Sequence, residues 1–237
     1  YKRQAFDLLR LALTQPRFDP PAVERIRGQV VAGLMREQES PEAVAARAWY
    51  ARVFAGHPYA RAPQGDLSGV KAVRRADLAA YARAQLTRDR LVVAVVGDIT
   101  PEALAPALDH MFGGLPARSP LPEVPAARPA AAGTQVLPRD LPQTVAVFGL
   151  PGLRRDDPDW YAATVMNYIL GGGGFASRLT EEVREKRGLA YSVYTYLVPF
   201  DQAGLILGGV ATENARFPES MRLIRAELRR MRDEGPS

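Results

Sequence analysis

Residues 191–210 read YSVYTYLVPFDQAGLILGGV, and this stretch decides the fold class. Two runs rich in β-branched, aromatic and small apolar residues, 191–198 and 204–210, flank the turn-forming sequence PFDQ, a pattern typical of a β-hairpin. A further strand is predicted at 144–150, and an amphipathic helix at 218–232. Because strands and helices cluster here without regular β-helix-β alternation, the sequence predicts an α+β fold in which an antiparallel-rich sheet packs with helices.

The first half of the chain has a mainly helical pattern. Apolar spacing, N-terminal prolines and turn residues predict helices over residues 1–13, 21–40, 41–54, 67–73, 77–86 and 100–112. Residues 90–98, RLVVAVVGD, predict a strand buried on both faces. In the second half we expect a short strand at 135–137 and helices at 157–170 and 177–186.

A change of composition divides the chain. Five prolines stand among Ala and Arg between Leu115 and Thr134, without an apolar period, which is typical of a semi-extended linker. We therefore expect two domains, 1–115 and 134–237, joined by a Pro-rich linker at 116–133.

Composition excludes several classes of site. The 237 residues contain no Cys, so disulfides, thiolate zinc sites and cysteine nucleophiles are absent, and they contain two His. No apolar run is long enough to cross a membrane. The net charge of +5 is spread among acidic residues, and no basic stripe with interleaved aromatics indicates nucleic-acid binding.

Few residues qualify as chemical sites from the pattern alone. The run Gly171–Gly174 lacks the Lys of a phosphate loop and indicates either a flexible connection or a close approach of another segment. His57 is interpreted as a surface or packing histidine rather than a metal ligand, and His110 is assigned no function. Arg184 and Tyr191 bracket a helix stop at Gly188, so both donors can converge on one point, although the spacing alone favours a salt-bridged Arg and a packed Tyr.

Longer motifs carry a family resemblance. These are NYILGGGGFASRL at 167–179, VREKRGLAYSV at 183–193 and PQT at 142–144, with SPE at 40–42, FAGHPY at 54–59 and VVGD at 95–98 in the first half. The chain resembles the pitrilysin/insulinase zinc peptidases, the inverzincins, with its second half similar to their second homologous domain. Both halves are shorter than the family's domains, so the chain is expected to be a fragment with both domains truncated.

The resemblance has consequences for the metal site. Active members bind zinc through an H-x-x-E-H helix and a later Glu, and this chain has no such motif. The matching position of the later ligand is Gly33, which cannot bind zinc. A shifted register would offer Glu37 but would misplace Ser40-Pro41. No metal or other cofactor is therefore expected in this chain, and zinc is expected in a partner.

The family's substrate-binding Arg and Tyr match Arg184 and Tyr191. The resemblance thus implies that this chain is a metal-free, non-catalytic subunit of a bacterial zinc metallopeptidase that forms a heterodimer with a catalytic subunit. In it Arg184 and Tyr191 bind the peptide substrate, and Gly172, Gly173 and Phe175 lie beside the path of that substrate. The other possible partner is a homologous subunit. The alternatives are an assembly subunit without a role in hydrolysis, and a fragment of an active zinc endopeptidase whose metal motif lies upstream of Tyr1. Relatives make a periplasmic or secreted location the expectation, with the cytoplasm as the alternative.

Overall fold

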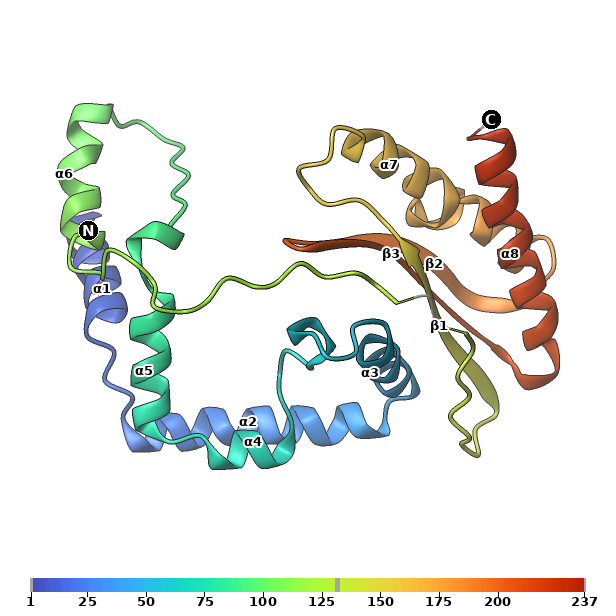
Figure 1. The fold of residues 1–237 in the computed structure, drawn as a ribbon, viewed down its shortest axis with the longest axis horizontal. Helices are drawn as coiled ribbons and strands as arrows, with labels where there is room; N and C mark the ends of the chain where they lie inside the picture. Colours follow the sequence, from blue (N-terminus) through green and yellow to red (C-terminus); the bar gives the residue numbers. More distant parts are fainter. Residues whose placement is uncertain (1, 131–132, 237) are drawn as a thin grey trace. The chain divides into compact units, whose positions relative to one another are not determined.

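The chain folds into two compact units in the computed structural model, which describes residues 2–130 and 133–236 (Figure 1). The helical unit comprises the described residues up to Met35 together with Gln64–Glu123. The sheet unit comprises Arg36–Pro63 and the described residues from Val124 onward. The homologous domains expected at 1–115 and 134–237, and a linker between them, stay a prediction.

The sheet unit is built on three antiparallel strands. They are β1 (Gln143–Pro151), β2 (Ala190–Phe200) and β3 (Ala203–Glu213), in the order β1-β3-β2. The predicted hairpin is confirmed, with Phe200 opposite Ala203 on either side of the turn. The predicted mixture of helices with a small antiparallel sheet is also confirmed.

Helical segments pack on one face of this sheet. Here α7 (Trp160–Asn167) runs on into the π-helical turn η3 (Tyr168–Gly172), and the 3₁₀ turn η4 (Gly174–Ala176) leads to the π-helical segment η5 (Thr180–Glu185). The C-terminal helix is α8 (Phe217–Glu234), preceded by the turn η6 (Asn214–Arg216).

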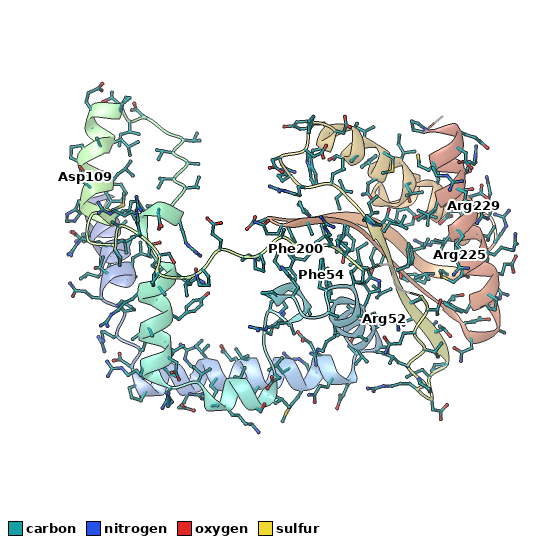
Figure 2. All side chains as sticks on the ribbon, viewed as in Figure 1. Arg52, Phe54, Asp109, Phe200, Arg225 and Arg229 are labelled. Atoms are coloured by element: carbon teal, nitrogen blue, oxygen red, sulfur yellow. The ribbon has the colours of Figure 1, made fainter. Side chains whose placement is uncertain are left out.

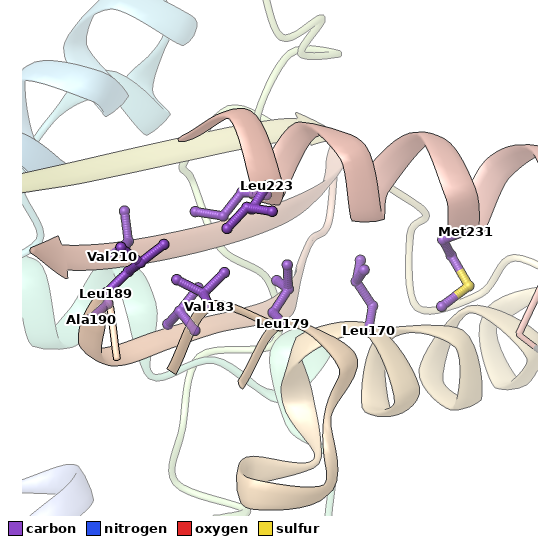
Figure 3. Packing of buried hydrophobic residues seen from close by; sticks show 10 residues of the cluster. Leu170, Leu179, Val183, Leu189, Ala190, Val210, Leu223 and Met231 are labelled. Atoms are coloured by element: carbon purple, nitrogen blue, oxygen red, sulfur yellow. The ribbon is translucent and has the colours of Figure 1, made fainter. Parts of the chain in front are cut away.

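Buried apolar side chains from these helical segments and the sheet form the main core (Figure 3). Leu179, Val183 and Ile224 are wholly shielded from solvent. They pack with Val193 and Val210 of the hairpin. The core therefore joins η5 to the strands that follow it, which fixes the end of η5 relative to the start of β2.

A second apolar cluster lies beneath β1 and the hairpin turn. It includes residues of α3 (Pro41–Val53) and η1 (Pro58–Ala60). Phe54 and Phe200 contribute to it (Figure 2). Their rings meet edge to face with 5.6 Å between centroids, and Tyr59 stacks on Phe200 at 4.4 Å. On β1, Gly149 leaves room for Trp49, because a Cβ at this glycine would lie 2.3 Å from the indole. Residues 41–60 are thus part of the sheet unit.

The helical unit contains α1 (Lys2–Thr14), most of α2 (Pro20–Glu39), α4 (Leu67–Ala72), α5 (Arg75–Gln85), η2 (Arg88–Arg90) and α6 (Pro101–Phe112). The predicted helices are confirmed to within a few residues. Arg27 of α2 donates a hydrogen bond to the carbonyl of Val73 at 2.8 Å, which ties α2 to the end of α4. None of the described helices is both long and apolar enough to cross a membrane.

Two predicted strands are wrong. Residues 91–96 are extended but pair with no described strand, and Val92 and Val96 are 93% and 101% exposed. The apolar run has the composition of a buried strand, yet a strand is stabilised only by neighbours that pair with its backbone and cover its faces. Residues 135–137 also form no strand, since a run this short, followed directly by Pro138, has no described partner.

Candidate functional site

Arg184 and Tyr191 converge, as their spacing predicts. Arg184 lies in the last turn of η5 and Tyr191 is the second residue of β2. Between them Gly188 adopts a φ of +58°, a left-handed conformation that glycine takes without steric cost, and the chain reverses there. The guanidinium carbon of Arg184 lies 5.0 Å from the centre of the Tyr191 ring, within cation–π range.

Phe175 joins them from the glycine-rich segment. Its ring centre lies 4.6 Å from the same guanidinium carbon, although nine residues separate Phe175 from Arg184 in the chain. The structure therefore brings three of the predicted site residues into one place. We call Phe175, Arg184 and Tyr191 the aromatic–arginine cluster.

The aromatic–arginine cluster faces solvent. Phe175 is 72% and Tyr191 is 83% exposed, whereas the Arg184 side chain is 29% exposed. Arg184 also forms an ion pair with Glu185, 3.4 Å between Nε and Oε1, and half-exposed pairs of this kind contribute little stability. Of the simpler interpretation of the spacing, the salt bridge of Arg184 is present, but Tyr191 is not a packed tyrosine, because its side chain is exposed. Two exposed rings beside a guanidinium leave a surface on which donors and aromatic faces are accessible.

A β-bulge directs Tyr191 away from the sheet. Ala190 lies opposite Thr212 and Ser192 lies opposite Ala211, so the register shifts across Tyr191. Bulges of this kind leave one residue without a ladder partner and re-aim its side chain, and they occur frequently beside functional sites. The bulge explains why Tyr191 is exposed within β2, between two residues that do pair with β3.

The loop between η5 and β2 is held by ion pairs on Glu182. Its carboxylate accepts hydrogen bonds from Lys186 Nζ and Arg187 Nη1, both at 2.6 Å. The Lys186 hydrogen bond, followed by that of Arg187, holds the pKa of Glu182 below its usual value. These contacts fix the residues between Arg184 and Gly188.

The glycine run allows a close approach of backbones, one of its two predicted roles. A Cβ at Gly171 would lie 2.5 Å from Thr195 Oγ1 and 2.8 Å from Thr195 N, so only glycine lets η3 lie against β2. At Gly172 and Gly173 a Cβ would meet Asn167 Nδ2 at 2.6 Å and Tyr168 O at 2.7 Å. Contact of Gly172 and Gly173 with a substrate stays a prediction.

His57 is a packing histidine, as predicted. It caps η1: its Nδ1 accepts from the backbone N–H of Tyr59 at 3.1 Å, and its Nε2 therefore donates to the carbonyl of Pro125 at 2.9 Å. The ring lies 4.6 Å from that of Tyr59. His110 lies in the last turn of α6 and pairs with Asp7 of α1 at 2.6 Å.

The described residues do not fit a zinc site. Within residues 2–130 and 133–236 no three His, Cys, Asp or Glu side chains lie together in a way that could hold a metal. Both ring nitrogens of His57 are occupied by backbone groups. No other atom lies within 4 Å of the position that a Cβ would occupy at Gly33. The Glu37 carboxylate forms an ion pair with Arg47, 3.4 Å between Oε2 and Nη2.

A nearly buried ion pair that was not predicted from the sequence joins Arg178 to α8. Arg178 Nε lies 2.9 Å from Glu227 Oε2, and their side chains are only 12% and 10% exposed. It ties the segment between Phe175 and η5 to α8. The available signal is Glu227 itself, a charged residue on the apolar side of α8 beside Ile224 and Met231.

Known proteins resemble this chain over most of its length. An uncharacterised zinc protease of Mycobacterium tuberculosis is 30% identical over 223 residues, which is 92% of this chain and 51% of that protein. A non-peptidase homolog of Helicobacter pylori is 29% identical over 195 residues, 82% of this chain and 45% of that protein. The chain spans about half the length of these relatives.

A solved structure and a family model agree with these relatives. The structure of a peptidase M16 inactive domain from Pseudomonas fluorescens superposes with a TM-score of 0.91 at 29% identity, covering 100% of this chain and 57% of that chain. The model described as "Peptidase M16 inactive domain" matches residues 72–237. The match includes the whole aromatic–arginine cluster and the glycine run, and the resemblance inferred from the motifs is confirmed. This chain belongs to the peptidase M16 inactive-domain family.

Proposed function

We propose that this chain is a metal-free, non-catalytic subunit of a bacterial zinc metallopeptidase and that it binds peptide substrate for a catalytic partner. Membership of an inactive-domain family and similarity to a non-peptidase homolog support a role outside the chemical step. Because the described residues offer no zinc site, the zinc, its water and the general base belong to the partner in this proposal.

The aromatic–arginine cluster carries the proposal. The Arg184 guanidinium supplies planar N–H donors and the Tyr191 phenol supplies an O–H donor, both suited to the carbonyl oxygens of a peptide backbone. The two side chains come from rigid elements, η5 and the start of β2, and meet at an exposed surface. Bound there, a peptide would be held in one orientation, and charge that develops on a nearby carbonyl oxygen would be stabilised once the partner closes on it.

The test is the substitution Tyr191→Phe in the full-length protein, assayed together with the catalytic zinc peptidase partner that the proposal requires. The substitution removes only the hydroxyl. One hydrogen bond to a carbonyl contributes about 1 kcal/mol, so kcat/KM for a fluorogenic peptide should fall about three- to tenfold. Thermal unfolding of the isolated protein should not change, since the ring is exposed and the hydroxyl has no structural partner among the described residues.

Tyr161→Phe is the matched control, because Tyr161 lies on α7, is as exposed as Tyr191 and is outside the aromatic–arginine cluster. It should leave kcat/KM unchanged. If Tyr191→Phe also leaves kcat/KM unchanged, the substrate-binding role is wrong and an assembly role is favoured. Zinc binding and cleavage by the full-length protein alone would instead identify it as an active endopeptidase.

A further inference from the structure

The turn that carries Phe175 is built as one piece with the helix that carries Arg184. The backbone N–H of Ser177 donates to the carbonyl of Gly174 at 3.2 Å, and Ser177 Oγ lies 2.9 Å from both that carbonyl and Thr180 Oγ1. Ser177 is wholly buried and Thr180 nearly so. Since Thr180 begins η5, the Phe175 turn cannot shift without disturbing the helix of Arg184.

The position of Phe175 is not explained by burial. At 72% exposure its ring gains little from the hydrophobic effect, so burial does not determine where the ring lies. The ring centre lies 4.6 Å from the guanidinium carbon of Arg184, within cation–π range. The turn that directs this ring to the guanidinium is formed by the glycine run, in which Gly174 has a φ of +58°, and by the buried Ser177.

We propose that Phe175 is a positioning residue that holds the Arg184 guanidinium ready for the substrate. The inference rests on the proposed peptide-binding function. A long arginine side chain is flexible, and binding loses free energy when it must be ordered. A ring that faces the guanidinium carbon restricts that movement and, because it accepts no N–H hydrogen bond, leaves the Nη donors available for a peptide carbonyl.

Phe175→Leu tests the proposal, because it keeps an apolar side chain and removes the ring. An exposed cation–π contact is worth about a two- to fivefold change in an equilibrium. In the full-length complex with its peptidase partner, KM for a fluorogenic peptide should rise by about that factor while kcat changes less, because Arg184 holds the substrate before and during reaction. Phe175→Tyr, which keeps an aromatic ring, should have a KM close to that of the unsubstituted protein. Tyr161→Leu, which removes an exposed aromatic elsewhere, should have no effect.

A spectroscopic measurement separates positioning from loss of structure. In full-length protein labelled with ¹⁵N-arginine, the Arg184 Nε–Hε signal is assigned from its absence in Arg184→Lys. Phe175→Leu should move this signal downfield, since the shielding by the ring face is lost, and should leave the other arginine signals in place. An unmoved Arg184 signal, or a KM equal to that of the unsubstituted protein, overturns the inference.

The inference and the proposed function fail separately. If Arg184→Ala raises KM and Phe175→Leu does not, Arg184 binds the peptide without help from Phe175, and only the positioning role is wrong. If Arg184→Ala itself leaves KM unchanged, the peptide-binding function is wrong and the positioning role fails with it.

Discussion

The substitution Gly171→Ala tests whether the glycine run is required for packing. A Cβ at Gly171 would lie 2.5 Å from Thr195 Oγ1, 2.8 Å from Thr195 N and 3.0 Å from Leu179 Cδ1, where ordinary contacts begin near 3.4 Å. The hydroxyl can rotate and the leucine can adjust, but the nitrogen belongs to the backbone of β2. Either η3 must lift from the strand or the strand must bend.

Overpacking of this kind costs about 1–3 kcal/mol. With a urea m-value of about 2 kcal/mol per M, the unfolding midpoint of the full-length protein should fall by roughly 0.5–1.5 M. Equilibrium urea unfolding followed by tryptophan fluorescence measures this shift, and Trp160 lies in α7, the helix that runs on into η3.

Thr195→Ala provides the matched background. Thr195 Oγ1 is buried without a hydrogen-bond partner among the described residues, so its removal alone should cost little. Gly171→Ala should then be less destabilising in the Thr195→Ala protein, because the shortest contact is gone while the contact with the nitrogen remains. An unchanged midpoint for Gly171→Ala, or the same cost in both backgrounds, would refute the steric reasoning.

Two further predictions concern the ion pairs near the site. Glu227→Gln leaves Arg178 charged and nearly buried, so the free energy of unfolding measured in urea should fall by about 3–5 kcal/mol. The double replacement of Arg178→Met with Glu227→Leu should recover most of that loss. Equal losses of stability in the single and the double variant would contradict the prediction. The pKa of Glu182 is lowered in the folded protein, so the contribution of this carboxylate to stability is complete above its usual pKa of 4.5 and is lost as pH falls through the lower folded value. The thermal unfolding temperature should therefore drop below about pH 4.5. In Glu182→Gln the drop should be less steep. An identical pH profile for the two proteins would show that Glu182 has no such role.

Local patterns predict the helices and the hairpin well because those elements are determined by neighbours in sequence. The turn at Asp201 and Gln202, shorter than the predicted PFDQ because Pro199 and Phe200 still pair with β3, sets the pairing of the hairpin, and Ser40 and Thr100 cap the helices that follow them. The run at 91–96 shows the limit of this reasoning. Its composition indicates burial, but burial depends on partner strands, and no described residue supplies one.

The site was partly predictable for the same reason. The stop at Gly188 between a helix and a strand indicates that Arg184 and Tyr191 can meet, and the structure confirms the convergence. The contact of Phe175 with Arg184 depends on the π-helical path of the chain after Leu179, which no local propensity reveals. The inward orientation of Arg178 depends on Glu227, which lies 49 residues further along the chain.

The π-helical form of η5 determines how this region can change in length during evolution. In η5 the backbone N–H of Lys186 bonds to the carbonyl of Glu181, five residues back, so the segment holds one residue more than an α-helical turn would. Deleting a single residue between Thr180 and Arg184 would exchange the π-helical turn for an α-helical one, and because each completes about one turn, Arg184 would keep nearly the same direction. The helix can therefore absorb the loss of one residue here by changing its form, without separating the arginine from the two aromatic rings.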